Sequence, residues 1–354
     1  MPNIQLRSGL ATFAAGLLLA LPVQAAKPKV VILATGGTIA GSAESQTQAG
    51  YASGQVGVDV LLGAVPQIAD LAAVSGEQVA NVGSQDMSDA IWLQLAARVN
   101  ELQNDSAVDG IVITHGTDTI EETGDFLHLT VRGRKPVVLP AAMRPSTALS
   151  ADGPLNLYNA VAVAADPAAA GKGVLIVAND DIHGARGITK TSTTDVETFL
   201  SPERGLIGVS LYGKNRYFRG PYRTHTADSE FSLDDVTELP RVDVIYVTAD
   251  VSPDLIDAAV AAGARGLVTA GVGNGNMNAA TLDAAQKAIE QGIVVVRSTR
   301  VPTGYVIRNG EVNDDKFNTI ASDDLNPPKA RVLLMLCLTG KRSLEEIQEI
   351  FIKY

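Results

Sequence analysis

Residues 29–41 read KVVILATGGTIAG, and this stretch decides the fold class. The apolar, β-branched run 30–34 is typical of a strand that is buried on both faces of a parallel sheet. It leads into Gly36 and Gly37, which let the backbone turn sharply and approach a ligand closely. Thr38 is then expected just beyond the end of the strand. A phosphate-binding loop would need a lysine and a hydroxyl residue after the last glycine, whereas TIA stands here.

The same pattern recurs along the first half of the chain. Apolar runs at 110–114, 136–139 and 173–178 predict further buried strands, and the stretches 91–102 and 156–165 have helical periodicity. Alternating strands and helices predict an α/β fold with a mostly parallel sheet. Ligands bind such sheets beyond the carboxyl ends of the strands, so the residues that follow each strand matter most.

A second, smaller α/β unit is expected towards the C-terminus. Residues 218–240 contain a Gly-Pro pair and little periodicity, which is typical of a linker. Strands are expected at 242–248, 266–270 and 293–298, and SLEE from Ser343 predicts a capping box that starts the last helix. The predicted boundaries are 1–25 for a signal peptide, 26–217 for a larger N-terminal α/β domain, 218–240 for the linker and 241–354 for a smaller C-terminal α/β domain.

The N-terminus is expected to be a targeting segment that is removed. Arg7 supplies a positive charge, residues 10–21 are apolar except for Thr12, and VQA at 23–25 precedes a cut near Ala26. A membrane anchor is the alternative interpretation. The apolar run is shorter than the roughly 20 residues that a spanning helix needs. We therefore expect a soluble mature protein that is exported to the periplasm, with no membrane contact after cleavage.

Composition and charge exclude several classes of partner. The net charge of -11 repels nucleic acid and anionic lipid, and the low aromatic content of 5% disfavours stacking platforms for bases. Cys337 is the only cysteine, so the protein cannot form an internal disulfide, and its apolar surroundings predict a buried thiol. The four histidines form no metal-ligand pair such as HExxH, so no metal is expected.

Two loops contain polar residues that could bind or react with a substrate. THGTDT places Thr117 and Asp118 after the strand at 110–114, and this carboxylate can bind a cationic amino group. GSQDM offers Ser84 and Gln85, which can hold a carboxylate or an ammonium by hydrogen bonds. A plainer interpretation stays open, because hydroxyl side chains often satisfy backbone groups near strand ends.

Two other motifs are weaker. Lys190 stands among threonines in TKTSTTD, where a lone lysine is usually solvated. GVGNGN at 271–276 is similar to a dinucleotide fingerprint, but Asn276 replaces its third glycine and no acidic residue at the right distance supports it. NAD binding is therefore not expected.

Taken together and in order, these motifs resemble the bacterial type II L-asparaginases. The similarity covers essentially the whole mature chain, and nine motifs in register are far more specific than any one of them. They are ATGGTIAG, GSQDM, ITHGTDT with EET, AMRPS, SADGP with NLYNAV, TKTSTTD, AGVGNGN, RVPTG and LNPPKARVLL.

The resemblance implies a role for each matched residue. Thr38 would be the primary nucleophile, and Tyr51 would lie beside it on a mobile lid. Lys190 would partner Thr117, the second threonine of the site. The implied substrate ligands are Ser84 and Gln85 for the α-carboxylate and α-amino groups, Thr117, Asp118 for the α-amino group, Ala142 with its carbonyl facing the leaving nitrogen, and Asn276 and Glu311 from a neighbouring subunit.

The implied reaction is attack of Thr38 on a side-chain amide, release of ammonia and hydrolysis of the ester by water. Backbone N–H groups near Gly37 and Thr117 are expected to form the oxyanion hole. The base is either Tyr51, assisted by Glu311, or Lys190 acting through Thr117; the first is preferred because Asp118 would keep the lysine charged.

L-Asparagine is the expected substrate and L-glutamine a poorer one, because a pocket distinguishes one methylene by only about 1–3 kcal/mol. The resemblance also implies a homotetramer of two close dimers, without metal or organic cofactor. Two alternatives stay open: a broad-specificity glutaminase-asparaginase and a periplasmic amino-acid-binding protein.

Overall fold

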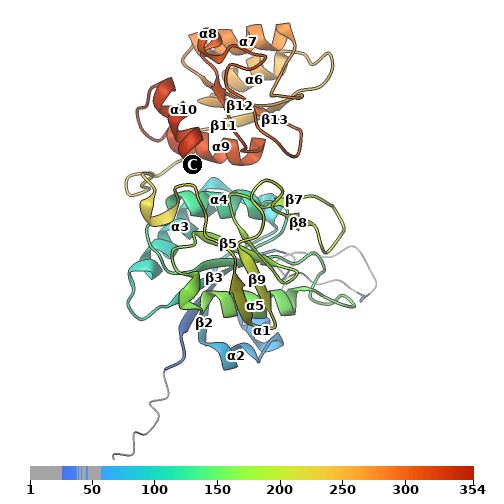
Figure 1. Cartoon of the computed structure of the whole chain (residues 1–354), viewed down its shortest axis with the longest axis vertical. Coiled ribbons are helices and arrows are strands. Elements are labelled where there is room, and N and C mark those ends of the chain that lie inside the picture. The colour runs from blue at the N-terminus through green and yellow to red at the C-terminus, as the bar shows by residue number, and fades with distance from the viewer. Residues whose placement is uncertain (1–25, 38, 40, 42–44, 47–56) are drawn as a thin grey trace, which may run out of the picture.

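The computed structural model describes residues 26–37, 39, 41, 45–46 and 57–354 (Figure 1). Within these residues the larger sheet has eight strands. They are β1 (Lys29–Gly36), β2 (Ala73–Val82), β3 (Gly110–Thr114), β4 (Val137–Pro140), β5 (Val174–Ala178), β6 (Asp181–Gly184), β9 (Gly208–Leu211) and β10 (Lys214–Tyr217). Their order is β10-β9-β6-β5-β4-β3-β1-β2. The strands β1 to β5 are parallel to one another, and β6, β9 and β10 each pair antiparallel with the strand of this sheet that comes before them in the chain.

Helices cover both faces of this sheet, because successive side chains of a strand point to opposite sides. Val31 and Leu33 of β1 join one core cluster, whereas Val30 and Ile32 join another. The first cluster includes α3 (Asp89–Asn104) and α4 (Ile120–Thr130). The second is covered by α1 (Val58–Ala64), α2 (Ile68–Leu71) and α5 (Gly153–Ala164). Burial on both faces explains why these strands have continuous apolar sequences.

The strands predicted at 30–34, 110–114, 136–139 and 173–178 are present as β1, β3, β4 and β5, within two residues at each end. Four strands of this sheet were not predicted. The edge strand β2 alternates exposed and half-buried residues and contains Gly76, so it lacks an apolar run. The antiparallel strands β6, β9 and β10 have only four residues each, too few for a clear period.

The smaller sheet lies in the C-terminal part and is parallel throughout. Its order is β11 (Val242–Tyr246), β12 (Gly266–Gly271), β13 (Val294–Thr299) and β14 (Ile320–Ala321). The helices α6 (Asp254–Ala261) and α7 (Ala279–Glu290) pack on one face, and α9 (Pro327–Cys337) and α10 (Leu344–Lys353) complete the other. Short elements are η2 (Ser84–Asp86), η3 (Pro167–Ala169), η4 (Thr226–Asp228) and α8 (Asp314–Phe317). The predicted capping box is present, because Ser343 and Glu346 exchange side-chain to backbone hydrogen bonds.

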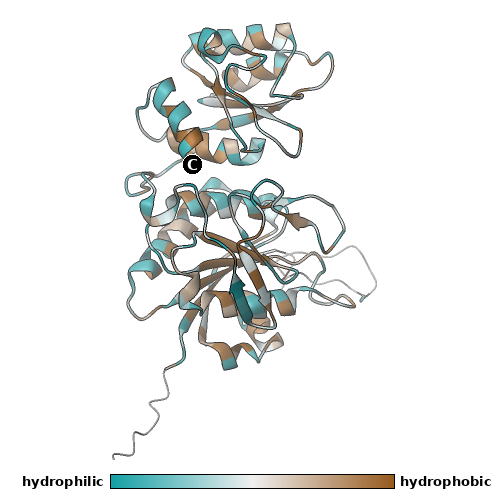
Figure 2. Cartoon of the chain, viewed as in Figure 1, coloured by the Kyte–Doolittle hydropathy of each residue, from teal (hydrophilic) through white to brown (hydrophobic). Residues whose placement is uncertain are grey.

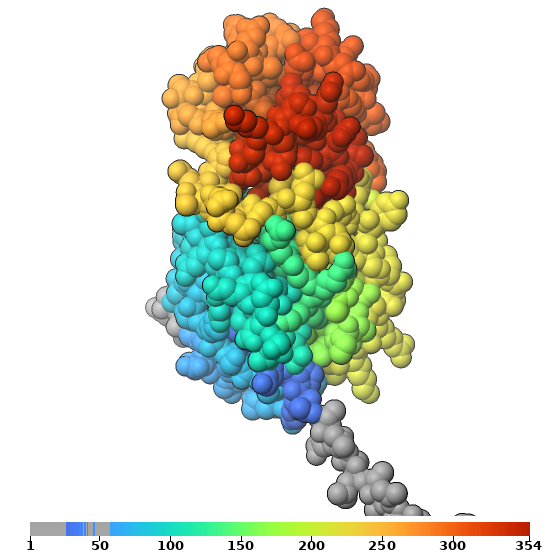
Figure 3. Space-filling view, turned by 90° about the vertical axis from the view of Figure 1, so that its left-hand side faces the viewer, coloured from blue at the N-terminus to red at the C-terminus, as the bar shows by residue number. Residues whose placement is uncertain are grey.

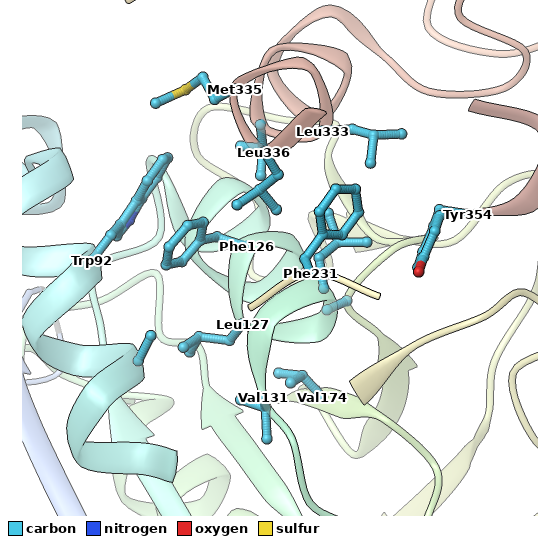
Figure 4. Close-up of a cluster of buried hydrophobic side chains, with 14 of the residues drawn as sticks. Trp92, Phe126, Leu127, Val131, Val174, Phe231, Leu333, Met335, Leu336 and Tyr354 are labelled. Atoms are coloured by element: carbon cyan, nitrogen blue, oxygen red, sulfur yellow. The ribbon is translucent and has the colours of Figure 1, made fainter. Parts of the chain in front are cut away.

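The two sheets share a hydrophobic cluster across α4 and α9. Figure 4 shows Leu336 of α9 above Phe126 of α4, with Met335 near Trp92, and the rings of Trp92 and Phe126 stack with centroids 5.1 Å apart. Hydrophobic residues of α9 appear brown at the level between the sheets in Figure 2. The C-terminal sheet is therefore fixed to the larger one through α9. The expectation of an α/β fold with a large, mostly parallel sheet and a smaller C-terminal α/β unit is confirmed, and the smaller sheet is parallel.

Residues 218–240 form no α-helix or strand, but the segment is packed against the rest of the protein. In Figure 3 this yellow segment wraps the waist of the molecule. Phe231 and Leu239 are buried. The ring of Phe231 lies 5.2 Å from that of the C-terminal residue Tyr354, and the guanidinium of Arg342 lies over it. The segment thus contributes apolar side chains to the contact between the two sheets.

Candidate functional site

Glycines bring the ends of three neighbouring strands into backbone contact. Gly36 and Gly37, with φ of 109° and 84°, turn the chain after β1. A Cβ at Gly37 would lie 2.2 Å from the nitrogen of Gly116, and a Cβ at Gly116 would lie 2.5 Å from Ser84 Oγ. Since β2, β1 and β3 are parallel neighbours, the segments after them gather at one edge of the sheet. The glycines are required because a side chain would separate these segments.

Ser84 links two of these segments. Its hydroxyl accepts a hydrogen bond from the backbone N–H of Asp118 at 3.1 Å, and its carbonyl accepts one from Thr119 Oγ1 at 2.8 Å. Ser84 is buried, whereas the neighbouring Gln85 is exposed and donates to Asp86 Oδ2 at 3.3 Å. Gln85 is therefore accessible beside a fixed serine.

Lys190 reaches the same edge from a small hairpin. The hairpin pairs β7 (Thr189–Lys190) with β8 (Phe199–Leu200). Lys190 Nζ donates to Thr117 Oγ1 at 3.0 Å and lies 2.8 Å from Asp118 Oδ1. Its side chain is only 21% exposed, so it differs from the solvated lysine that is usual in such a motif.

The hairpin itself is rigidly tied. The hydroxyl of Thr198 accepts from the Ser192 N–H at 2.7 Å and donates to the Ser192 carbonyl at 2.6 Å. The N–H of Thr191 donates to the Thr198 carbonyl at 2.9 Å. Within the motif, Thr191 Oγ1 donates to the Thr198 carbonyl at 2.8 Å and Ser192 Oγ accepts from the Asp195 N–H at 3.2 Å, so short hydroxyl side chains close the loop on its own backbone. We name Ser84, Thr117, Asp118 and Lys190 the polar cluster.

His115, between β3 and Thr117, has a structural place. Its Nδ1 lies 2.7 Å from the carbonyl of Gly116, so Nδ1 carries the proton and donates. Its Nε2 then accepts from Thr123 Oγ1 at 2.9 Å, and that hydroxyl accepts from Trp92 Nε1 at 2.8 Å. Burial lowers the pKa of His115 to about 4. A neutral histidine thus fixes the peptide that precedes Thr117, a feature that sequence reasoning missed.

The N–H of Gly37 is already in use. It donates to the carbonyl of Val82 at 3.1 Å and so supports the edge between β1 and β2. The role of N–H groups near Gly37 in an oxyanion hole stays a prediction, and Gly37 itself donates to the sheet edge. The N–H of Thr117 donates to no backbone carbonyl among the described residues. It is therefore a better candidate than the Gly37 N–H to donate to an oxyanion.

Ala142 lies after β4 in a backbone that is held on both sides. Asn156 Nδ2 donates to the carbonyl of Ala141 at 2.8 Å, and Asp152 accepts from the N–H groups of Met143 and Arg144 at 2.8 and 2.9 Å. The Ala142 side chain is buried. Its carbonyl role stays a prediction, but its position is well defined.

Asn276 and Glu311 lie together in the C-terminal part. Asn276 Nδ2 donates to Glu311 Oε2, although the two residues are 35 positions apart. The Asn276 side-chain oxygen is buried without a hydrogen-bond partner among the described residues. Within the same residues no hydrogen bond or ion pair joins either side chain to the polar cluster. Their predicted place in a neighbouring subunit's site is compatible with this separation.

Thr38, Tyr51 and the predicted signal peptide 1–25 lie outside the described residues. The segment that leads to Thr38 ends at Gly37, against Gly116. Among the described residues, no cluster of histidine, cysteine and carboxylate side chains is suited to a metal. None of the helices in that part of the chain combines the length and apolarity needed to cross a membrane. Cys337 is a buried free thiol, as predicted, and burial raises its pKa to about 12.

Comparisons with known proteins identify this arrangement. The family profile described as "Asparaginase, N-terminal" matches residues 29–222, and "Glutaminase/Asparaginase C-terminal domain" matches residues 241–351. The chain is 52% identical to L-asparaginase 2 of Escherichia coli, over 93% of this chain and 94% of the relative. It is 51% identical to the probable periplasmic L-asparaginase of Haemophilus influenzae, over 92% of each chain. It is 43% identical to the glutaminase-asparaginase of Pseudomonas fluorescens, over 99% of this chain and 100% of the relative.

A solved structure agrees in fold. The crystal structure of a probable cytoplasmic L-asparaginase from Campylobacter jejuni has a TM-score of 0.90 and 46% identity, covering 93% of this chain and 100% of the other. Fold, site and comparisons together define a hydrolase with a large and a small α/β sheet. The chain belongs to the asparaginase family.

Proposed function

We propose that the chain is an L-asparaginase that hydrolyses L-asparagine to L-aspartate and ammonia through an ester on Thr38. The observation that carries the proposal is the position of Lys190 Nζ at the sheet edge, within 3.0 Å of both Thr117 Oγ1 and Asp118 Oδ1. The backbone of the segment leading to Thr38 packs directly against Gly116 at that edge. A hydroxyl beside a charged, partly buried cluster is the arrangement that an acyl transfer needs.

The polar cluster offers complementary groups for a small zwitterion. Asp118 is exposed enough to accept from the α-ammonium of a substrate, with Gln85 beside it. Ser84 and Gln85 supply donors for the α-carboxylate. Gripping both α-groups fixes how far the side-chain amide extends, and this places its carbonyl near residue 38.

The proposed reaction has two steps. Thr38 Oγ forms a bond to the amide carbon while its proton passes to a base, the C–N bond breaks, and the nitrogen leaves as ammonia after gaining a proton. Water then adds to the ester, the C–Oγ bond breaks, and aspartate and the free hydroxyl result. The N–H of Thr117 stabilises the negative oxygen in both steps.

Tyr51 is the proposed base for Thr38, assisted by Glu311. The geometry at Lys190 supports this choice, because its ammonium donates to Thr117 and is paired with Asp118. Lys190 instead acts electrostatically, by orienting the Thr117 hydroxyl and stabilising negative charge that develops nearby.

The alternative activity is a glutaminase-asparaginase of broad specificity, the name carried by the Pseudomonas fluorescens relative. We favour asparagine because the chain keeps the SQD, GNGN and RVPTG patterns. Glutamine places its amide carbon one methylene further from the gripped α-groups. Because this discrimination is worth only about 1–3 kcal/mol, some glutamine hydrolysis is expected.

The proposal extends to assembly and location. Residues 1–25 act as a signal peptide, and the mature protein works in the periplasm, in keeping with the name of the Haemophilus influenzae relative. The domains are 26–217 and 241–354, joined by 218–240. The protein forms a homotetramer of two close dimers, in which Asn276 and Glu311 of one subunit complete the site of another.

Ammonia release decides between the proposals. The mature protein is mixed with asparagine and with glutamine, and kcat/KM is measured for each. A slow amide analogue is used to trap the ester, which mass spectrometry then maps. An adduct on Thr38 and a higher kcat/KM for asparagine support the proposal. Binding without ammonia release would instead indicate an amino-acid-binding protein, and equal kcat/KM values a glutaminase-asparaginase.

A further inference from the structure

Lys329 is a buried lysine at the contact between α9 and the larger sheet's helices. The residue is 3% exposed. Its Nζ donates to the carbonyl of Arg186 at 3.0 Å and to that of Ile188, and lies 3.4 Å from Glu121 Oε2. Burying an ammonium is unfavourable unless its hydrogens are paired, and here three partners match three hydrogens. The ammonium is therefore held at one position.

Its partners belong to the segments that carry three members of the polar cluster: Thr117, Asp118 and Lys190. Glu121 is in the first turn of α4, three residues after Asp118. Ile188 lies two residues before Lys190. Lys329 thus joins these segments on one side, while Lys190 joins them on the other through Thr117 and Asp118. In Figure 1, α9 lies directly above α4, and the β7–β8 hairpin lies on the same upper side of the larger sheet.

The neighbours of Lys329 brace the same two segments. Asn326, the N-cap of α9, donates from Nδ2 to Glu121 Oε2 at 3.2 Å. Asp324 binds the guanidinium of Arg186 with both oxygens, at 2.9 and 2.6 Å. Every one of these contacts comes from the chain around the start of α9. The C-terminal unit therefore helps to set how the hairpin segment lies against the start of α4.

We propose that Lys329 is a positioning residue for the reaction. By holding the Ile188 carbonyl and Glu121 together, it sets the separation of Lys190 Nζ and Thr117 Oγ1. The inference rests on the proposed function, since it assigns Lys329 an effect that is transmitted through Lys190. It also gives the C-terminal unit a part in the chemistry of its own chain, besides the residues that it supplies to a neighbouring subunit.

The test compares Lys329→Met with the unaltered protein. Methionine keeps an unbranched chain but removes all three polar contacts. Misplacing a reacting group by about 1 Å costs on the order of 100-fold in rate, so we expect kcat for asparagine to fall about 10- to 100-fold, with a smaller change in KM. Arg223→Gln is the matched control. It removes a 2.6 Å ion pair with Asp323 at the same junction and should change kcat less than about twofold.

A double-mutant cycle separates positioning from general damage. If Lys329 acts through Lys190, then Lys329→Met in a Lys190→Met background should lower kcat by less than about threefold further. If the two losses multiply, Lys329 has only a structural role and the proposal is overturned. Should Lys329→Met fail to fold, Glu121→Gln replaces it in the same cycle. A smaller kcat loss that again disappears in the Lys190→Met background is then expected.

Hydrogen exchange gives a readout that does not depend on activity. Amides of residues 186–200 should exchange faster in folded Lys329→Met than in the unaltered protein, because the hairpin loses its anchor. Unchanged exchange there would overturn the proposal even if kcat fell. Conversely, if the unaltered protein releases no ammonia, the proposed function fails, and the exchange result still decides whether Lys329 holds the hairpin.

Discussion

Lys190 Nζ donates a hydrogen bond to Thr117 Oγ1 across 3.0 Å, although the two residues are 73 positions apart in the sequence. The bond joins a hairpin outside the main sheet to the end of a central strand. Because the ammonium also contacts Asp118 at 2.8 Å, the positive charge stays beside the threonine. The Thr117 hydroxyl therefore accepts from Lys190 and is free to donate its own hydrogen towards a substrate or another hydroxyl.

This geometry predicts the relative effects of two substitutions. Tyr51→Phe should lower kcat at least as much as Lys190→Met, because the first removes the proposed base and the second an electrostatic partner. Both losses are expected to be about 100-fold or more, the usual range for acid–base groups. Initial rates of ammonia release at saturating asparagine measure them. If Tyr51→Phe stayed far more active than Lys190→Met, Lys190 and not Tyr51 would be the base.

The contact between Gly116 and Ser84 predicts a binding defect. A Cβ at Gly116 would lie 2.5 Å from Ser84 Oγ and 2.8 Å from Ser84 Cβ, so Gly116→Ala must displace the serine. We expect KM for asparagine to rise about tenfold or more, since a substrate ligand is moved. Adding Ser84→Gly removes the clash and should restore stability but not KM. If Gly116→Ala bound asparagine normally, Ser84 would not be a substrate ligand.

Apolar runs and glycine turns carry most of the information that sequence alone provides. The runs before Gly36 and His115 predicted the central strands, because burial on both faces demands continuous apolar residues. Thr117 and Asp118 were then placed at the edge of the sheet by the rule for parallel sheets. Ser84 follows β2, which was not predicted, and the structure brings it beside Asp118. By contrast, nothing local in TKTSTTD reveals that Lys190 is partly buried. Its environment depends on contacts with residues far away in the sequence.

The ionic contacts between the two sheets were the least predictable feature. Lys329 and Glu121 lie within two of the resemblance motifs, yet their pairing depends on how α9 docks on α4. Docking is determined by shape and by the shared hydrophobic cluster, which no short motif encodes. Sequence reasoning therefore found groups near the chemistry but missed those that hold the supporting segments.

Asp324 predicts a stability effect at the same junction. Burial opposes its ionisation, but hydrogen bonds and charges of Arg186 and Arg204 outweigh burial, so the pKa of Asp324 lies well below its ordinary value. The folded state thus favours the carboxylate. This contribution is present above the unfolded pKa of about 3.9 and is lost as the pH falls through the folded value.

We therefore expect Asp324→Asn to destabilise the protein at pH 7 by about 3–5 kcal/mol, because two arginines lose their buried partner. Chemical unfolding measures the loss. Asp228→Asn is the control, since its pair with Arg134 is about 60% exposed on both sides and should contribute less than about 1 kcal/mol. Equal effects of the two substitutions would show that the Asp324 contacts are not formed in solution.

Asp125 on α4 predicts the opposite pH dependence. It is 2% exposed, and burial raises its pKa to about 6 against the lowering effect of Lys329 and Arg186, with Glu121 and Asp324 adding to the increase. A folded pKa above the unfolded value of about 3.9 means that the folded state holds the proton more tightly. The stabilisation from this group is complete below about pH 4 and is lost as the pH rises through about 6.

Asp125→Asn replaces the carboxyl with a neutral group of similar shape, so the variant does not lose stability as the pH rises through about 6. We expect the variant to be more stable than the unaltered protein at pH 8, by about 1–3 kcal/mol, and equally stable near pH 4. Unfolding curves at several pH values test this, with Asp59→Asn on the exposed face of α1 as the control that should not change the pH dependence. If the difference between Asp125→Asn and the unaltered protein were the same at pH 4 and pH 8, packing and not ionisation would explain it. If the variant were less stable at pH 8, the attraction of the Asp125 carboxylate to Lys329 and Arg186 would exceed the cost of burying its charge. The carboxylate would then be a needed partner of these two residues.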